Sequence, residues 1–485
     1  MGFEIISIFL AILSIFNLFF AFVIIFIEKR NATAIWAWIM VLFFIPFLGF
    51  VLYLIFGQNL TRKRLFDWAD IEKIGIEELI QEQMHTLRNG TFQFSDSVSS
   101  KHRDLIYMQL ANDGSVLTKE NDVRVYTDGH EKFDNLIKDI EKARDHIHLQ
   151  YYILRSDNLG RRVIEALRKK AEEGVVVRLL YDDMGSRKMR KKELSGLEAA
   201  GGEVAVFFPK RLPIINLRLN YRNHRKIVVI DGKTSYVGGF NIGDEYLGLS
   251  KKFGYWRDTH LRLEGQSVKT AQTRFILDWN QANSRNPVHY EERYFPTLAE
   301  PGECSMQIVS SGPDSEWEQI KNGYIKMINS AKHSVYIQTP YFIPDESLMD
   351  AIRIASLSGV DVRIMIPSMP DHPFVYWATY SHIGIVLRAG ARVYIYNNGF
   401  IHAKTIMVDD EISSVGTANI DVRSFRLNFE VNAFIYHAQT TKQLTDTFLY
   451  DMDTHSSELT LEAYRQRSLW IRIKEAVSHL LSPIL

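Results

Sequence analysis

Two long apolar stretches occupy the beginning of the chain. Residues 5–27 contain no charged side chain and are long enough to cross a hydrocarbon core of about 30 Å. Residues 34–56 are also uncharged, and Trp36, Trp38 and Tyr53 lie near their ends, where aromatic side chains favour the membrane interface. The pattern predicts a transmembrane helical hairpin over residues 1–57.

A cleaved signal peptide is the alternative for the first stretch. The stretch is longer than the apolar region of a signal peptide, lacks a basic segment before it and is followed at once by a second apolar span. Lysine and arginine are more frequent after the second span than in the turn between the spans. This bias favours a cytoplasmic position for the rest of the chain, and we expect a protein of the cell membrane with two transmembrane helices.

The polarity pattern changes twice after the hairpin. Residues 58–118 are polar and contain helical runs. We predict that they form a connecting segment, in which we identify no catalytic residues. From residue 119 onward, apolar strands alternate with amphipathic helical stretches, which is typical of an α/β layered architecture with a largely buried sheet.

This α/β pattern occurs twice in the same order. The helix-to-strand segment at 141–154 matches the segment at 329–344, with the same alanine and glutamine positions in both. The repeats close with HRKIVVID at 224–231 and HAKTIMVD at 402–409. Because the order of segments is preserved, we predict two copies of one α/β unit, with a first domain at 119–300, a second at 301–485 and a shared site where they meet.

Each repeat contains one copy of the pattern HxKxxxxD. The residues are His224, Lys226 and Asp231 in the first copy, and His402, Lys404 and Asp409 in the second. The intervening residues are apolar, which indicates a strand, so each histidine and the lysine two positions later face the same pocket. The aspartates have the opposite parity, and we expect them to support the backbone and not to contact substrate.

A turn of small residues that ends in asparagine follows each motif. The turns read GGFN at 238–241 and GTAN at 416–419, and they end at Asn241 and Asn419. Such turns let the backbone approach a ligand closely, and an asparagine amide can donate to a phosphate oxygen. One motif alone would be weak evidence, but two in register within a repeat are unlike a chance match.

These residue types can carry out phosphoryl transfer. A neutral imidazole can attack phosphorus, and a protonated imidazole can supply a proton to the leaving alkoxide. Lysines and asparagines can neutralise the charge that develops on the phosphoryl oxygens. This chemistry needs no metal and no other cofactor. The alternative of core histidines with ordinary lysines is disfavoured, because a lysine on the inward face of an apolar strand is costly and here it occurs twice.

Composition narrows the classes of partner. The 57 basic and 57 acidic residues among 485 balance, so an anionic substrate must be bound by local charge and a nucleic acid partner is disfavoured. The single cysteine, Cys304, excludes an internal disulfide framework and a cysteine-built zinc site. The oligomeric state does not follow from composition.

The duplicated motifs resemble the HKD motifs of the phospholipase D superfamily over essentially all of residues 119–485. Within it the chain is similar to bacterial cardiolipin synthases in its N-terminal hairpin and in the stretches YRNHRKIVVIDG, GFIHAKTIMVDD and GTANIDVRSFRLNFE. The resemblance implies two phospholipase D-type α/β/α sandwich domains related by a pseudo-twofold axis. It also implies a transferase that joins two phosphatidylglycerol molecules through a phosphohistidine, with glycerol as the other product.

The resemblance assigns His224 as nucleophile and His402 as acid and then base, although the reverse order stays open. It implies that Glu430 and Asp258 orient the histidines, and the first asparagine turn departs from the family's GSxN form at Gly239. Rival interpretations are a hydrolase with the same site, a phosphatidyltransferase that uses another alcohol and a lipid-binding scaffold without activity.

Two further segments contain both apolar and basic residues. An insert at 210–220, absent from the second repeat, precedes the first motif and is either a lipid-entry loop or a packed strand extension. The C-terminal segment 468–485 has near-helical apolar spacing and either lies on the membrane or packs on the catalytic part.

Overall fold

The computed structural model describes residues 32–45, 75–209, 220–298 and 302–480, with the isolated residues 8, 12, 15, 19, 49, 53 and 66. The chain divides into two compact units, residues 1–63 with 208–221, and residues 64–207 with 222–485. Most of the predicted hairpin, and the insert except Asn220, lie outside the described residues. In the first unit one helix is described, α2 (Ala32–Phe44). No helix formed by the described residues has both the length and the apolar character needed to span a bilayer.

The second unit begins with three helices in the predicted connecting segment. Helix α4 ends in Gly90, which adopts the left-handed conformation and closes the last turn with its backbone N–H. Leu87 of α4, with Leu105 and Ile106 of α6, is packed into the hydrophobic core of the second repeat. The segment therefore belongs to that core. The helices are α4 (Ile76–Asn89), α5 (Ser97–Lys101) and α6 (Arg103–Asp113).

The first repeat alternates strands and helices as its sequence predicts. Asp128 and Asp157 cap the helices α7 and α8 by accepting hydrogen bonds from the backbone of the first turn. The elements are β1 (Thr118–Tyr126), α7 (Gly129–Lys142), β2 (His146–Tyr151), α8 (Asn158–Glu172), β3 (Val176–Asp182), α9 (Lys191–Ala199), β4 (Glu203–Phe207), β5 (Arg222–Asn223), β6 (Ile227–Ile230), β7 (Thr234–Gly238), β8 (Trp256–Arg257), β9 (His260–Glu264) and α10 (Ser267–Ala282).

The second repeat follows the same order and adds two helices at its end. Its elements are β10 (Cys304–Ser311), α11 (Gln319–Ser330), β11 (Ser334–Gln338), β12 (Phe342–Ile343), α12 (Glu346–Leu357), β13 (Asp361–Pro367), α13 (Pro373–Arg388), β14 (Arg392–Tyr396), β15 (Phe400–Ile401), β16 (Thr405–Val408), β17 (Ile412–Gly416), β18 (Ile420–Asp421), α14 (Val422–Arg426), β19 (Asn428–Tyr436), α15 (Ala438–His455), β20 (Ser456–Glu458), α16 (Leu461–Arg465) and α17 (Leu469–Leu480).

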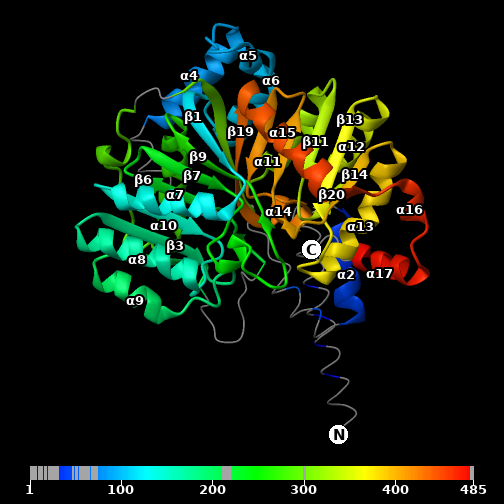
Figure 1. Cartoon of the computed structure of the whole chain (residues 1–485), viewed down its shortest axis with the longest axis horizontal. Helices are drawn as coiled ribbons and strands as arrows, with labels where there is room; N and C mark the ends of the chain where they lie inside the picture. The colour runs from blue at the N-terminus through cyan, green and yellow to red at the C-terminus, as the bar shows by residue number, and fades with distance from the viewer. Residues whose placement is uncertain are drawn as a thin grey trace. The chain divides into compact units, whose positions relative to one another are not determined.

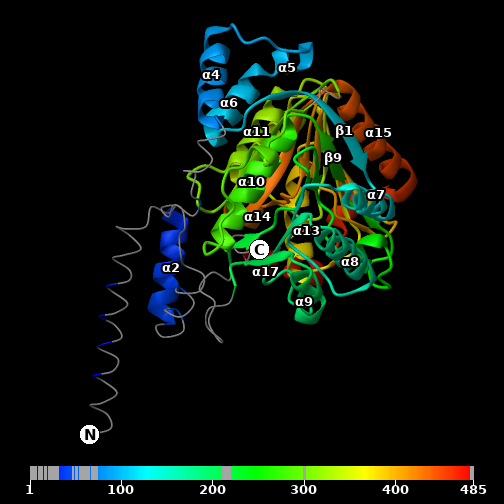
Figure 2. The ribbon, with the colours of Figure 1, turned by 90° about the vertical axis from the view of Figure 1, so that its left-hand side faces the viewer.

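Both repeats contribute to one continuous sheet. Its strands run β4-β3-β2-β6-β7-β9-β1 in the first repeat, then β10-β19-β17-β16-β11-β13-β14 in the second, so the second order mirrors the first. The two repeats join where β1 and β10 pair antiparallel, with Asn121 opposite Cys304. In Figures 1 and 2 the helices cover both faces of this sheet, with α10 and α11 on one face and α7 and α15 on the other.

This arrangement is an α/β fold built from two copies of one unit, as the sequence predicts. The two repeats share one continuous sheet. The reason is that β1 and β10 are the edge strands of their repeats, and pairing satisfies backbone groups that an edge would leave open. Each half keeps its own hydrophobic cluster.

Candidate active site

Each motif histidine is held by a strand from the opposite repeat. The short strand β5 precedes His224 and pairs with β19, and the backbone N–H of His224 donates to the carbonyl of Phe429 at 2.9 Å. In the same way β15 precedes His402 and pairs with β8, and the N–H of His402 donates to the carbonyl of Arg257 at 2.7 Å. The residue after Phe429 is Glu430, and the residue after Arg257 is Asp258. The pairing thus brings a carboxylate of each repeat beside the histidine of the other.

The two histidine–carboxylate pairs therefore cross between the repeats. His224 Nδ1 lies 2.9 Å from Glu430 Oε2, and His402 Nδ1 lies 2.6 Å from Asp258 Oδ2. His224 Nδ1 also lies 3.1 Å from the carbonyl oxygen of Thr417. Both neighbours of this nitrogen accept hydrogen bonds, so Nδ1 bears the proton and the Nε2 lone pair is free to act as a nucleophile.

Electrostatics in the site favour a neutral His224. Burial lowers the pKa of the His224 imidazole to about 4, although the Glu430 carboxylate acts in the opposite direction. Burial raises the pKa of Glu430, but His224 and Lys226 outweigh it and the net shift is downward. At neutral pH the pair is therefore a neutral imidazole beside a carboxylate.

The second pair has a similar environment. The pKa of His402 is lowered first by burial and then by Lys404, while Asp258 raises it. Burial raises the pKa of Asp258, and the charges of Lys404 and His402 lower it below its ordinary value. Lys404 Nζ lies 2.8 Å from His402 Nδ1, so a positive charge is close to the imidazole.

The two motif lysines lie behind the histidines. Lys226 is fully buried and donates to the carbonyl of His224 at 2.6 Å, and Lys404 donates in the same way to the carbonyl of His402. Burial lowers the pKa of Lys226 to about 7 and that of Lys404 to about 8. The sequence places both ammonium groups in the pocket with the histidines, whereas neither lysine lines it here. Their hydrogen bonds to the motif's own backbone account for the difference.

The motif aspartates bind the backbone of the preceding repeat segment. Asp231 accepts hydrogen bonds from the N–H groups of Arg144, Asp145 and His146, at 2.8 to 3.2 Å. Asp409 accepts from the equivalent three residues, Lys332, His333 and Ser334. Each aspartate lies one residue beyond the end of its strand with a positive φ, and it ties the motif strand to the start of the neighbouring strand.

Asn241 and Asn419 both line the cavity that the histidines line. Asn241 Oδ1 accepts from the N–H of Ile153 at 3.1 Å, which fixes the orientation of its amide. Asn419 is 5% exposed, and its Oδ1 has no hydrogen-bond partner among the described residues.

The structure explains the departure of the first turn from the family pattern. A Cβ atom at Gly239 would lie 1.9 Å from Asp258 Oδ1, so no side chain fits between this turn and the carboxylate. The matching residue of the second turn, Thr417, uses its hydroxyl to bind the backbone of Val431. Glycine at position 239 is therefore required by the close approach of Asp258.

The shared cavity has a volume of about 560 Å³, in the range of small-ligand sites. The ring of Tyr152 lies 4.8 Å from the His224 ring, and the ring of Trp256 lies 5.1 Å from the His402 ring. Neither aromatic residue has a role predicted from the sequence, because their spacing does not distinguish them from aromatic residues of the core. Cationic side chains of the lining are Arg155, Lys188, Lys252 and Arg423.

Two buried arginines hold the carboxylate segments. Arg225 donates to the carbonyl of Glu430 at 3.0 Å and pairs with Asp278 of α10 at 2.7 Å. Asn428 binds the other oxygen of the Glu430 carboxylate at 3.1 Å. Arg225 stands between His224 and Lys226 before β6, so no break in an apolar pattern marks it in the sequence.

Arg257, also in the first repeat, anchors the other carboxylate segment. Arg257 donates to the carbonyl of Asp258 at 2.6 Å and pairs with Asp451 of α15 at 2.9 Å. The equivalent glutamines of the repeat, Gln150 and Gln338, donate to Asp278 and Asp451 respectively. Each histidine-facing carboxylate is thus anchored through an arginine to the last long helix of a repeat.

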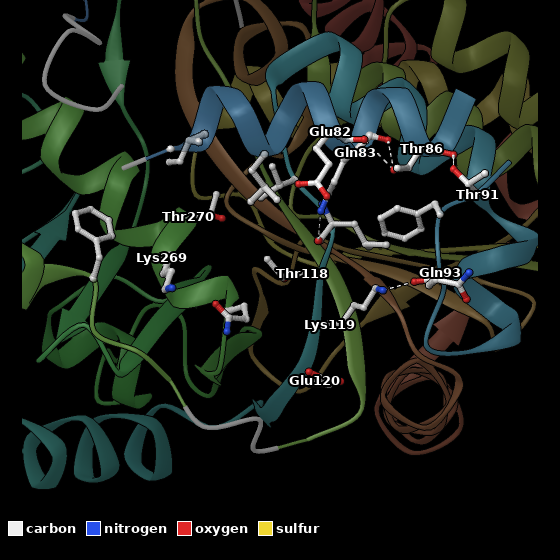
Figure 3. Close-up of a pocket in the computed structure, with 18 of the residues that line it drawn as sticks. Glu82, Gln83, Thr86, Thr91, Gln93, Thr118, Lys119, Glu120, Lys269 and Thr270 are labelled. Atoms are coloured by element: carbon white, nitrogen blue, oxygen red, sulfur yellow. Dashed lines mark hydrogen bonds between the residues drawn. The ribbon is translucent and has the colours of Figure 1, made fainter. Parts of the chain in front are cut away.

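A second cavity, of about 740 Å³, lies among α4, β1 and the start of α10 (Figure 3). Its lining mixes acidic, basic and apolar side chains, and Lys119 there donates to the carbonyl of Gln93. None of the motif residues lines it. Its size alone does not make it the chemical site, and the paired histidines identify the smaller cavity.

A duplicated HxKxxxxD motif whose two histidines share one cavity across a repeated α/β fold defines a phospholipase D-type protein. A family model described as "Cardiolipin synthase, PLD-like domain" matches residues 136–256 and 324–452, and a second, "Phospholipase_D-nuclease N-terminal", matches residues 15–58. The chain belongs to the bacterial cardiolipin synthase family of the phospholipase D superfamily.

Curated relatives support this assignment over the full length. The chain is 63% identical to the major cardiolipin synthase of Bacillus subtilis, covering 99% of each chain. It is 57% identical to a cardiolipin synthase of Staphylococcus aureus, covering 97% of this chain and 95% of that one. The crystal structure of phosphatidylserine synthase from Haemophilus influenzae matches with a TM-score of 0.59 at 14% identity, covering 80% of this chain and 100% of that one, which shows the shared fold.

Proposed function

We propose that the protein is a membrane-bound cardiolipin synthase that converts two phosphatidylglycerol molecules into cardiolipin and glycerol. In the first step His224 Nε2 attacks phosphorus, the bond to the head-group glycerol oxygen breaks, and His402 gives that oxygen a proton. In the second step the terminal hydroxyl of another phosphatidylglycerol attacks phosphorus. His402 takes the hydroxyl proton and the phosphorus–nitrogen bond breaks, which restores both histidines.

The crossed histidine–carboxylate pairs are the observation that carries this proposal. Glu430 keeps the His224 proton on Nδ1, and Asp258 supports the charged form of His402. The neighbours of Nδ1 differ, since His224 faces two acceptors whereas His402 faces a carboxylate and the Lys404 ammonium group, and we assign the first to the nucleophile and the second to the acid. Because the same histidine can return its proton in the second step, one site can serve both half-reactions.

The remaining site residues would stabilise the phosphoryl oxygens. Lys226 and Lys404 place positive charge directly behind the two histidines, and Asn241 and Asn419 lie at the cavity wall. Charge near the developing negative oxygens is worth most in a buried site. We assign the lysines to charge stabilisation and the asparagines to phosphate binding, with Asp231 and Asp409 as supports.

Membrane attachment is part of this proposal. The N-terminal family match at residues 15–58 overlaps most of the predicted hairpin, and we propose two transmembrane helices there with the catalytic part in the cytoplasm. A phospholipid substrate then reaches the site from the same membrane. Four basic and three acidic side chains line the cavity, and the small basic excess suits an anionic head group.

The products of the wild-type protein test this function. Purified protein in mixed micelles is incubated with head-group-labelled phosphatidylglycerol in the presence of a chelator. We expect glycerol and cardiolipin in equal amounts. Phosphatidic acid in place of cardiolipin would mean that water is the acceptor and that the protein is a hydrolase. Loss of cardiolipin formation when another alcohol is added would identify a broader phosphatidyltransferase.

Asparagine in place of Asp258 is expected to move the alkaline limb of kcat/KM to lower pH. Asp258 raises the pKa of His402, so its loss lowers that pKa and the acid gives up its proton at lower pH. Because kcat/KM reports groups of the free enzyme, its pH profile in micelles measures the shift. Rates that fall equally at every pH would instead assign Asp258 a purely structural role.

A further inference from the structure

Helix α17 presents its apolar side chains outward. Leu469, Trp470 and Leu480 are 74%, 73% and 78% exposed, while Glu475 and Ser478 are buried. An amphipathic helix at a protein surface normally buries its apolar face. In α17 the polar face is directed to the protein instead.

Polar contacts fix this orientation. Arg467 forms two hydrogen bonds of 2.7 Å with the buried carboxylate of Glu475. His479 contacts the hydroxyl of Ser381 on α13 at 3.2 Å, and Lys474 lies over the ring of Trp377 on the same helix at 5.2 Å. The outward direction of the apolar face is therefore built into the packing of α17 on α13.

The outward residues form one continuous stripe. At 3.6 residues per turn, the positions 469, 470, 473, 477 and 480 fall within about 100° of the helix circumference. Arg472 lies beyond one edge of this stripe and Lys474 beyond the other, and both are exposed. An apolar stripe between two basic edges is typical of a helix that lies in the plane of a membrane interface.

Helix α13 connects this stripe with the active-site cavity. His372, immediately before α13, and Val375, in its first turn, line the cavity. Phe374 in the same turn is 55% exposed. Figure 1 shows α17 beside α13, in agreement with the contacts between them. A surface that the stripe contacts would therefore lie close to the helix that borders the site.

We propose that the outward face of α17, with Phe374, docks on the surface of an anionic phospholipid bilayer. Basic side chains at both edges complement anionic head groups, whereas a second copy of the chain would bring like charges together. The inference rests on the proposed function, because a lipid substrate gives the docking its purpose. Docking holds the cavity near the head groups and shortens the path of each lipid into the site.

A lipid-quenching experiment tests the docking without measuring catalysis. A fluorescent probe is attached at Val477→Cys in the full-length protein with Cys304→Ala, in vesicles containing phosphatidylglycerol and nitroxide-labelled lipid. We expect a blue shift and strong quenching at position 477. A probe at Leu357→Cys, on α12 and 65% exposed, is the matched control and is expected to show neither.

Quenching at 477 no greater than at 357 would overturn the proposal, and energy transfer between probes on different molecules would identify a second copy as the occupant. Cardiolipin formation is assayed on the same samples, so quenching without synthesis would contradict the proposed function alone.

Turnover gives an independent readout. Glutamate at Trp470 and Leu480 together is expected to reduce the ratio of turnover on vesicles to turnover on soluble short-chain phosphatidylglycerol about tenfold. Leu357→Glu is expected to leave that ratio unchanged. Equal losses on both substrates for the α17 variant would mean that the helix acts through folding and not through docking.

Discussion

Alanine at His224 is expected to abolish both glycerol release and cardiolipin formation, with a loss of turnover of roughly ten-thousandfold or more. The imidazole Nε2 is the atom that we assign to attack on phosphorus. The other described histidines of the cavity lining are His402 and His372, and both belong to the second repeat. Turnover is measured with head-group-labelled phosphatidylglycerol in mixed micelles.

Two controls separate chemistry from folding in this experiment. His224→Asn keeps an amide that can donate to Glu430, so the buried carboxylate retains a partner, and we expect it to be as inactive as the alanine variant. His333→Ala changes an exposed histidine outside the site and is expected to be fully active. Appreciable cardiolipin formation by His224→Asn would remove His224 from the chemistry.

Alanine at His402 is expected to produce a different defect. With phosphatidylglycerol the variant should lose roughly a thousandfold in turnover, because the leaving glycerol oxygen needs a proton. With a phosphatidyl ester of a nitrophenol, whose leaving group needs none, the first step should proceed and release about one nitrophenolate per protein molecule. The second step should then stop, since no base activates the acceptor hydroxyl. Rapid-mixing absorbance measures this burst.

The same substrate distinguishes the two possible orders of the histidines. A burst from His402→Ala with none from His224→Ala supports His224 as nucleophile. The opposite result would reverse the roles and make Glu430 the partner of the acid. Absence of a burst from either variant, with normal binding, would mean that both histidines are needed before any bond breaks.

The repeat and its motif residues could be predicted from the sequence because each has a local signal. The HxKxxxxD pattern and the asparagine turn that follows it are each visible twice in the sequence. The histidines and asparagines line the cavity, whereas both lysines lie behind it. Strand alternation did not predict this difference, because residues 224–226 and 402–404 precede the strands β6 and β16 and are not part of them.

No local sequence pattern predicts the crossed pairing of the histidines with carboxylates. Glu430 lies 206 positions from His224 in the chain, and only the pairing of β5 with β19 brings them together. Strand pairing over such a separation depends on the whole sheet. For the same reason the pairing of β1 with β10, which joins the two repeats, could not be predicted.

The roles of the anchoring arginines and of Gly239 also could not be predicted from the sequence. Arg225 lies among polar residues before β6, and its partner Asp278 lies on a helix whose position could not be derived from the pattern. Gly239 departs from the family's GSxN form, and only the position of Asp258 shows that no side chain fits there. The residue type at such positions depends on close packing between segments that are distant in the sequence.

Identification of the covalent intermediate tests the account most directly. The protein is mixed with phosphatidylglycerol labelled in the phosphate, quenched in alkali within one turnover, digested and analysed by mass spectrometry for histidine that carries the labelled phosphatidyl group or its deacylated glycerophosphoryl form. We predict the label on the peptide that contains His224, and its absence from that peptide in His224→Asn. Label on the His402 peptide, or cardiolipin formed at full rate with no labelled histidine, would contradict the account.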